Sequence, residues 1–235
     1  MGFKLLNRYY DLLFPANLTV VDKLSELFKE GSALLDAGCG TGSYALLLAQ
    51  KGFKVTGIDI NPDFINIAKE KAKDKSEVDF LTQDLTSFSL NQSFSGIYSI
   101  GNTLPLLGRN GILKALANFY LHLTPGGLLV GQIVNFKLFF ATGTFPFPEK
   151  KLNQDHLIFR RRYEPYEDKV RFSIELVFSE KGEIYTDVML LYPLSMEELA
   201  RLLKDAGFKH ISFYRDFSFA PYDPEGRDLV FTAQK

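Results

Sequence analysis

Three glycines at alternate positions form the segment of this sequence with the clearest chemical potential. They lie in Leu34-Leu-Asp-Ala-Gly-Cys-Gly-Thr-Gly42, between a short apolar run and the apolar segment 44–49. Glycine is needed where the backbone adopts a positive φ or approaches a ligand closely. A strand, a turn and a helix in this order place the turn at the carboxyl edge of a parallel sheet, where such sheets bind ligands.

A carboxylate follows the glycines in the sequence, at the end of the next predicted strand. Asp59 ends the next apolar run, 17 residues after Gly42, and a carboxylate there can accept hydrogen bonds from both ribose hydroxyls of an adenosine. The dinucleotide pattern G-x-G-x-x-G is not met, because the third glycine comes one position early, and no Gly-Lys-Ser/Thr of a phosphate-binding loop is present. An NAD-dependent oxidoreductase is therefore a weaker alternative.

Strands alternate with helices through the first part of the chain, which predicts an α/β fold with a doubly wound, mostly parallel sheet. From residue 156 onward apolar and polar residues alternate in β-rich runs, which predicts a small antiparallel β insertion. The expected helices are 1–31, 44–49, 62–73, 111–123 and one that Ser195 caps; the expected strands are 32–36, 53–58, 78–81, 96–100, 128–134, 156–163, 169–179, 183–191, 211–214 and 229–232.

We treat the chain as a single domain with four parts. These are an N-terminal helical cap (1–31), a ligand-binding core (32–135), a β-rich insertion (136–192), and a C-terminal helix with the last two strands of the core (193–235). The aromatic-rich stretch 136–147 either forms a lid over the ligand site or covers the edge of the sheet.

Composition excludes several functions. The formal net charge is −1, so there is no overall electrostatic case for a nucleic acid or an anionic membrane as partner. Cys39 is the only cysteine, which excludes an internal disulfide and a cysteine-based zinc site, and no metal is expected. No apolar run of about 20 residues and no secretory signal occur, so we expect a cytoplasmic protein that is a monomer or a homodimer.

Four segments together resemble a known family. The segment 34–42 resembles the first motif of class I S-adenosylmethionine-dependent methyltransferases, and Gly57-Ile-Asp-Ile60, Gln83-Asp84-Leu85 and Leu123-Thr-Pro-Gly-Gly-Leu-Leu129 resemble later motifs in the same order. The resemblance covers about residues 32–135 and 194–235. It implies a seven-stranded Rossmann-like sheet, S-adenosyl-L-methionine as cofactor and S-adenosyl-L-homocysteine as product.

The resemblance also implies residue roles. Asp36 would lie near the methionine ammonium, Asp59 would hold the ribose, and Asp84 would accept from the adenine amine. Asp36 as a cap of the next helix and Cys39 as a small filler of the turn are the structural alternatives. The implied cofactor-binding residues are Asp36, Gly38, Cys39, Gly40, Gly42, Asp59, Ile60, Asp84, Leu85 and Gly101.

The expected methyl acceptor is a small molecule, methylated at nitrogen or oxygen. Cys39 lies in the cofactor turn, which disfavours cytosine carbon-5 chemistry, and Gly101-Asn-Thr-Leu-Pro105 lacks the Asn/Asp-Pro-Pro-aromatic pattern of enzymes that methylate amines of nucleic-acid bases. No catalytic residue is assigned, since in-line displacement depends mainly on alignment. The candidates for the acceptor site are Tyr9, Tyr10, Asn102 and Arg161, although Tyr9 and Tyr10 also fit the core. Arg160-Arg161-Arg162 could recognise an acidic substrate, but alternation along a strand also puts two of these arginines on one face in solvent.

Three alternative functions remain at this stage. The chain is a non-catalytic protein that binds S-adenosylmethionine or S-adenosylhomocysteine, an NAD-dependent oxidoreductase, or a protein methyltransferase. Cofactor binding without turnover, binding of NAD, and a substrate screen respectively would distinguish them.

Overall fold

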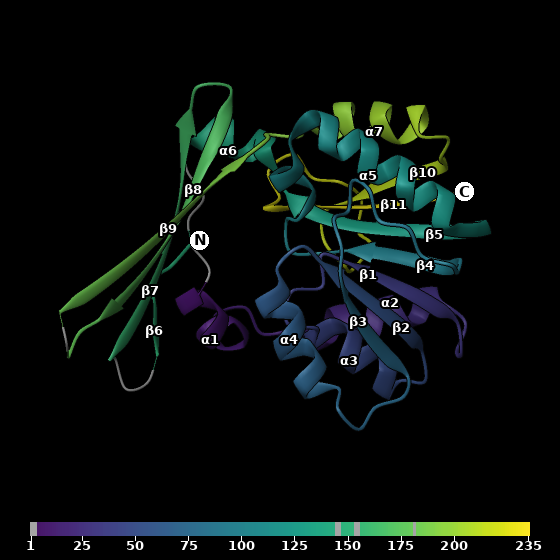
Figure 1. The fold of residues 1–235 in the computed structure, drawn as a ribbon. Coiled ribbons are helices and arrows are strands. Elements are labelled where there is room, and N and C mark those ends of the chain that lie inside the picture. The colour runs from purple at the N-terminus through teal and green to yellow at the C-terminus, as the bar shows by residue number, and fades with distance from the viewer. Residues whose placement is uncertain (1–3, 144–146, 153–155, 181) are drawn as a thin grey trace.

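A seven-stranded, mostly parallel sheet forms the centre of the larger part of the molecule (Figure 1). The computed structural model describes residues 4–143, 147–152, 156–180 and 182–235. The strands are β1 (Ala33–Ala37), β2 (Lys54–Asp59), β3 (Val78–Thr82), β4 (Phe94–Ser99), β5 (Leu123–Val134), β10 (Lys209–Tyr214) and β11 (Asp228–Gln234). Their order is β10-β11-β5-β4-β1-β2-β3, and only β11 pairs antiparallel with its neighbours. The predicted fold class is confirmed.

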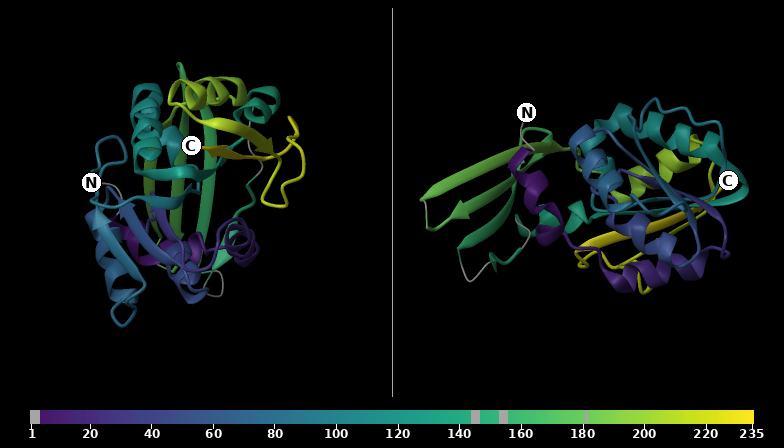
Figure 2. Two further views of the ribbon diagram at one scale, coloured as in Figure 1. Left: turned by 90° about the vertical axis from the view of Figure 1, so that its right-hand side faces the viewer. Right: turned by 60° about the horizontal axis from the view of Figure 1, so that its bottom comes forward.

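Helices cover both faces of this sheet (Figures 1 and 2). The helices α2 (Leu18–Leu27), α3 (Ser43–Gln50) and α4 (Pro62–Lys71) pack on one face, and α5 (Gly108–His122) and α7 (Met196–Asp205) pack on the other. Successive side chains of β1 pack in the two hydrophobic cores on opposite faces of the sheet. Leu34 packs with residues of α2 and α3, and Leu35 packs with residues of α5. A strand buried on both faces is continuously apolar, which explains why this segment shows no alternation. No helix in the described part of the chain is long and apolar enough to cross a membrane.

Capping residues fix the helix starts that the sequence predicts. Asn61 accepts a hydrogen bond from the Asp63 backbone N–H at the start of α4, and Ser195 accepts one from the Glu198 backbone N–H at the start of α7. Other boundaries differ from the prediction by a few residues. The largest difference is in β5, which begins at Leu123 rather than at residue 128.

The N-terminal segment is two helices, so the single helix expected over residues 1–31 is wrong. The helix α1 (Lys4–Leu13) ends before Pro15, and α2 begins after Asn17, whose side chain accepts from the Thr19 backbone N–H. Proline lacks an N–H and disfavours a helical residue before it, which explains the break. The chain can therefore turn, and α1 lies between the larger sheet and the smaller one (Figure 1).

A second sheet of four antiparallel strands stands beside the first (Figure 1). It follows α6 (Phe136–Thr142) and consists of β6 (Lys150–Leu152), β7 (Leu157–Tyr166), β8 (Lys169–Phe178) and β9 (Glu183–Leu191), in that order. The three expected strands are confirmed, and β6 is an addition that the sequence did not indicate. Leu13 of α1 packs with Leu157, Phe159 and Ile174 of this sheet, so the N-terminal helix joins the two sheets.

Candidate functional site

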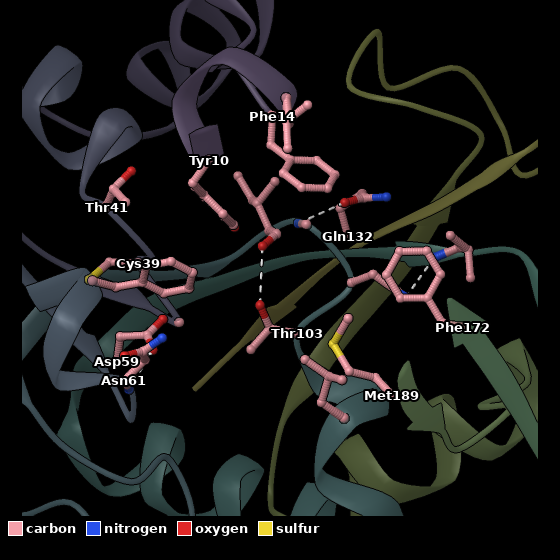
Figure 3. Close-up of a pocket in the computed structure, with 18 of the residues that line it drawn as sticks. Tyr10, Phe14, Cys39, Thr41, Asp59, Asn61, Thr103, Gln132, Phe172 and Met189 are labelled. Atoms are coloured by element: carbon pink, nitrogen blue, oxygen red, sulfur yellow. Dashed lines mark hydrogen bonds between the residues drawn. The ribbon is translucent and has the colours of Figure 1, made fainter. Parts of the chain in front are cut away.

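A cavity of about 760 Å³ opens where β1, β2 and β4 end (Figure 3). One end lies against the glycine-rich turn, and the other end reaches the second sheet, which contributes Phe172 and Met189. Four elements therefore meet at one site: the turn, α1, the loop after β4 and the smaller sheet. The predicted site residues that line the cavity are Tyr10, Asp36, Gly38, Cys39, Asp59, Ile60, Asp84, Leu85, Gly101, Asn102 and Arg161.

The glycine-rich turn has the backbone conformation that its sequence predicts. Gly38, Gly40 and Gly42 all have positive φ, at 86°, 53° and 78°. A Cβ on Gly38 would lie 2.5 Å from Cγ2 of Thr103, and a Cβ on Gly42 would overlap Phe80. Gly38 lines the cavity, whereas Gly40 and Gly42 shape the turn without lining it. Their role in cofactor binding stays a prediction.

Asp59 joins the turn to the end of β2. Its Oδ2 accepts from the Gly40 backbone N–H and its Oδ1 from the Asn61 backbone N–H, both at 2.9 Å. Burial raises the pKa of this carboxyl, although the two backbone donors oppose that effect. Each oxygen keeps further lone pairs, so Asp59 remains able to accept from a bound ligand.

Asp36 is a buried carboxyl without sufficient partners. It is 4% exposed, and its Oδ2 has no hydrogen-bond partner. The hydroxyl of the neighbouring Tyr98 forms no hydrogen bond of standard length and angle, although it lies near enough to Asp36 to oppose the rise in the pKa of that carboxyl. Burial raises the pKa of Asp36 to about 8. The N-cap position of α3 is Gly42, which has no side chain, and a hydrogen bond from the Ala45 backbone N–H in the first turn of α3 opposes the rise in the pKa of Asp36. The alternative role of Asp36 at the start of this helix therefore stays open. Unsatisfied buried polar groups in native proteins need an explanation, and a cationic ligand group is one.

The acid predicted near an adenine lies in a tight turn. Oδ1 of Asp84 accepts from both the backbone N–H and the hydroxyl of Thr86, at 2.8 Å each. Leu85 is buried, whereas Ile60 is 68% exposed, and both line the cavity together with Asp84. The roles of these three residues toward an adenine stay predictions.

The loop after β4 is held by side chains from the middle of the sheet. The Gly101 backbone N–H donates to Oε1 of Gln132 at 2.9 Å, and the Gln132 amide donates to Asp228 at 2.9 Å (Figure 3 labels Gln132). Asn102 adopts a left-handed φ of 68°, and its Oδ1 accepts from the Val134 backbone N–H. The amide oxygen of Asn102 is therefore occupied in positioning the loop.

Of the two N-terminal tyrosines, only Tyr10 lines the cavity. Its ring packs on Phe64 and over Gly40, and burial raises its pKa. Tyr9 packs on Phe178 against the core of the smaller sheet. This agrees with the alternative that the tyrosine belongs to the core.

The helix α1 is tied to the glycine-rich turn by a polar network. Asp11 accepts hydrogen bonds from the hydroxyls of Thr41 and Ser43 and forms an ion pair with Lys71, and these contacts lower its pKa. The Lys71 ammonium also donates to the Thr41 carbonyl at 3.0 Å. The network closes the cavity on the side of α1.

Arg161 points into the cavity, whereas its neighbour Arg160 does not line it. The Arg161 guanidinium carbon lies 4.1 Å from the ring centroid of Phe147. Arg160 instead pairs with Glu149 at 2.7 Å. The solvent-exposed strand face that the sequence analysis considered therefore holds Arg160, whereas Arg161 lies in the cavity. Phe147 lines the cavity and α6 packs at the junction of the sheets, while residues 144–146 of the aromatic stretch lie outside the described residues.

Several residues that line the cavity were missed by sequence reasoning. Gln132 carried a signal, since it is a polar residue within the apolar run of β5. Thr41, Ser43 and Asn61 are neighbours of the predicted turn and of Asp59, and their positions could have indicated them. Others lie in segments whose place in the fold depends on tertiary packing, among them Lys150, Phe172, Met189, Arg227 and Asp228. Among the described residues no cluster of His, Cys, Asp and Glu has the arrangement of a metal site.

Comparisons with known proteins identify the same architecture. Residues 34–127 match the family model described as "Methyltransferase domain". The protein named "Putative methyltransferase YqeM" of Bacillus subtilis (strain 168) is 26% identical over 88% of this chain and 85% of its own length. An S-adenosylmethionine-dependent methyltransferase from Clostridium acetobutylicum ATCC 824 superposes with a TM-score of 0.82, 17% identity and coverage of 98% and 97% of the two chains. The sugar N-methyltransferase KedS8 from Streptoalloteichus sp ATCC 53650 gives 0.72, 18% identity and coverage of 100% and 93%.

Proposed function

We propose that this chain is an S-adenosylmethionine-dependent methyltransferase that methylates a nitrogen or oxygen atom of a small molecule. Its match to a methyltransferase domain at residues 34–127 and its fold support the proposal. The observation that carries this proposal is the continuity of the cavity. The same space borders the glycine-rich turn at one end and Phe172, Met189 and Leu191 of the smaller sheet at the other. A cofactor and a small acceptor can therefore lie side by side, shielded from water.

The residues at the glycine-rich end suit S-adenosylmethionine. The unpaired oxygen of Asp36 suits the ammonium of the methionine part, and burial of that pair would strengthen it. Asp59 suits the ribose hydroxyls, and Asp84 with Leu85 suits the adenine. The absence of a side chain at Gly38 leaves the backbone accessible. When bound, the cofactor supplies an electrophilic methyl group on a sulfonium.

The protein's own contribution is alignment rather than acid–base chemistry. The described carboxylates in the cavity lining are Asp36, Asp59, Asp84 and Asp228, and no histidine is among the described lining residues. Three of these carboxylates are at the cofactor end. Holding two reactants in line supplies much of the acceleration of a displacement. An uncharged amine needs no base to attack, and the N-methyltransferase named among the structural neighbours fits an acceptor of this kind.

Methyl transfer to a panel of acceptors tests the proposal. The protein would be incubated with methyl-labelled S-adenosylmethionine and individual small amines and hydroxyl compounds, and S-adenosylhomocysteine would be quantified. We expect acceptor-dependent product with at least one compound. Asp59→Asn should reduce it strongly, and Asp63→Asn, a matched change outside the cavity, should not. Cofactor binding without acceptor-dependent product would contradict the proposal and favour a binding protein.

A further inference from the structure

Three cationic side chains gather at the acceptor end of the cavity. They are Lys150 of β6, Arg161 of β7 and Arg227, which directly precedes β11. They are far apart in the sequence and come from both sheets, so only the fold brings them together. The chain as a whole has a formal net charge of −1, so this concentration of positive charge is local.

Arg161 has no carboxylate partner among the described residues. Its guanidinium packs against aromatic rings, at 4.1 Å from the centroid of Phe147 and 5.4 Å from that of Phe159. The adjacent Arg160, by contrast, has carboxylate partners. Its Nε lies 2.7 Å from Oε2 of Glu149, and its Nη1 lies 3.8 Å from Oε2 of Glu175. The partly buried arginine is thus the one without a counter-ion.

The other two cations are also poorly compensated. The Lys150 ammonium donates to the carbonyl of Leu13, which carries no charge. Arg227 lies 3.9 Å from Asp228, at the limit of an ion pair, and its guanidinium carbon lies 5.8 Å from the ring centroid of the same Phe147 that Arg161 covers. Asp228 also accepts a hydrogen bond from the Gln132 amide, so its carboxylate is shared between Arg227 and Gln132.

The cations also oppose one another. Burial and the neighbouring Arg227 lower the pKa of Arg161, and burial with the neighbouring Arg161 lowers the pKa of Lys150. Desolvated charges without partners destabilise a protein unless a ligand compensates them. A planar guanidinium in such a place is suited to a carboxylate or a phosphate, which it can bind through two parallel hydrogen bonds.

We propose that the methyl acceptor carries an anionic group, a carboxylate or a phosphate, which Arg161 binds with the help of Arg227 and Lys150. This inference rests on the proposed function, because it describes the other substrate of the same cavity. The anionic group would lie against the second sheet and direct the rest of the acceptor toward Thr103 and the cofactor end. Specificity for the acceptor would then reside in the smaller sheet together with Arg227 at the start of β11, and binding of the cofactor in the larger sheet.

Binding of small aromatic probes to the protein saturated with S-adenosylhomocysteine tests this proposal. Benzoate and phenyl phosphate are the anionic probes, and benzamide and benzyl alcohol are the neutral ones; ligand-detected NMR gives each dissociation constant. We expect at least one anion to bind more tightly than both neutral probes. Which anion binds distinguishes a carboxylate from a phosphate site.

Variants assign the effect to individual cations. Arg161→Gln should weaken anion binding about 10- to 100-fold, as expected for loss of charge-assisted hydrogen bonds. Arg160→Gln removes the same charge one residue away and should leave anion binding unchanged. Arg227→Gln, at a side chain that is 57% exposed, should weaken anion binding as well and provides a second test if Arg161→Gln folds poorly.

The outcomes that overturn the proposal are distinct from those that overturn the function. Equal binding of anions and neutral probes, no binding of either anion, or equal effects of Arg161→Gln and Arg160→Gln would show that Arg161 only packs against the rings. S-adenosylhomocysteine binding is measured separately, and its absence in the wild-type protein would refute the proposed function. The anions are also titrated without S-adenosylhomocysteine, so the two failures can be told apart.

Discussion

Asp36→Asn removes a carboxyl that is buried beside the glycine-rich turn and has one oxygen without a hydrogen-bond partner. The amide has nearly the same volume as the carboxyl, so packing is preserved. The wild-type carboxyl has a pKa of about 8 in the folded protein because of burial, against about 3.9 in an unfolded chain. Between these pH values the folded state holds a proton that the unfolded state has lost.

The sign of the pH dependence follows from that difference. The stability contributed by the protonated Asp36 is fully present below about pH 4 and is lost as the pH rises to about 8. The free energy of unfolding should fall by about 1.4 kcal/mol per pH unit in this interval, or on the order of 5 kcal/mol across it. The Asp36→Asn variant lacks this term, so it should become the more stable protein as the pH approaches 8.

Cofactor binding should show the opposite dependence. We expect the ammonium of S-adenosylmethionine to pair with the ionised carboxylate of Asp36. On that assignment, the affinity of the wild-type protein for the cofactor should increase by up to about tenfold per pH unit from pH 6 to 7.5. The variant should bind weakly at every pH. Urea denaturation at pH 5, 6, 7 and 8, with calorimetric titration of the cofactor, measures both effects. Parallel pH profiles for the wild-type protein and the variant would refute the assignment of Asp36.

Three further substitutions probe the rest of the site. Asp59→Ala should weaken S-adenosylmethionine binding about 10- to 100-fold and lower the melting temperature, because it also removes the acceptor for a backbone N–H of the turn; an unchanged dissociation constant in a folded variant would contradict the ribose assignment. Gly38→Ala should abolish cofactor binding and cost about 1–3 kcal/mol of stability, since the new Cβ would press on Thr103. Gly143→Ala, with a similar φ but open space around it, is the matched control for strain alone, and equal effects on binding would refute the steric argument. Asp11→Asn should loosen α1, which limited proteolysis at neutral pH would detect as faster cleavage near the N-terminus; because contacts lower the pKa of Asp11, the wild-type protein should lose this tie only in acid, and an unchanged cleavage rate would show that α1 is held by packing.

The geometry of the glycine-rich end of the cavity was predictable because its signals are local. Positive φ at Gly38, Gly40 and Gly42, and an acid at the end of β2, depend on a strand, a turn and a helix that are adjacent in the sequence. The same is true of the cap at Asn61. Such features follow from backbone geometry over a few residues, so one sequence is sufficient to indicate them.

The acceptor half depends on contacts that sequence spacing does not encode. Alternation along β7 separates Arg160 from Arg161 but does not say which of them faces the cavity. Pro15 breaks the N-terminal helix, yet the direction that α1 then takes is decided by the apolar contacts of Leu13 with the second sheet. Arg227 and Lys150 meet Arg161 only because β6, β7 and the start of β11 converge.

Thermal denaturation with separate additions of S-adenosylmethionine, S-adenosylhomocysteine and NAD tests the central claim most directly. A ligand at about 100 times its dissociation constant adds roughly 2.7 kcal/mol of stability, which corresponds to a shift of about 5–10 °C for a chain of this size. The structure predicts this shift for the first two compounds and none for NAD. A shift with NAD alone, or with none of the three, would contradict the assignment of the cavity and of every residue placed in it.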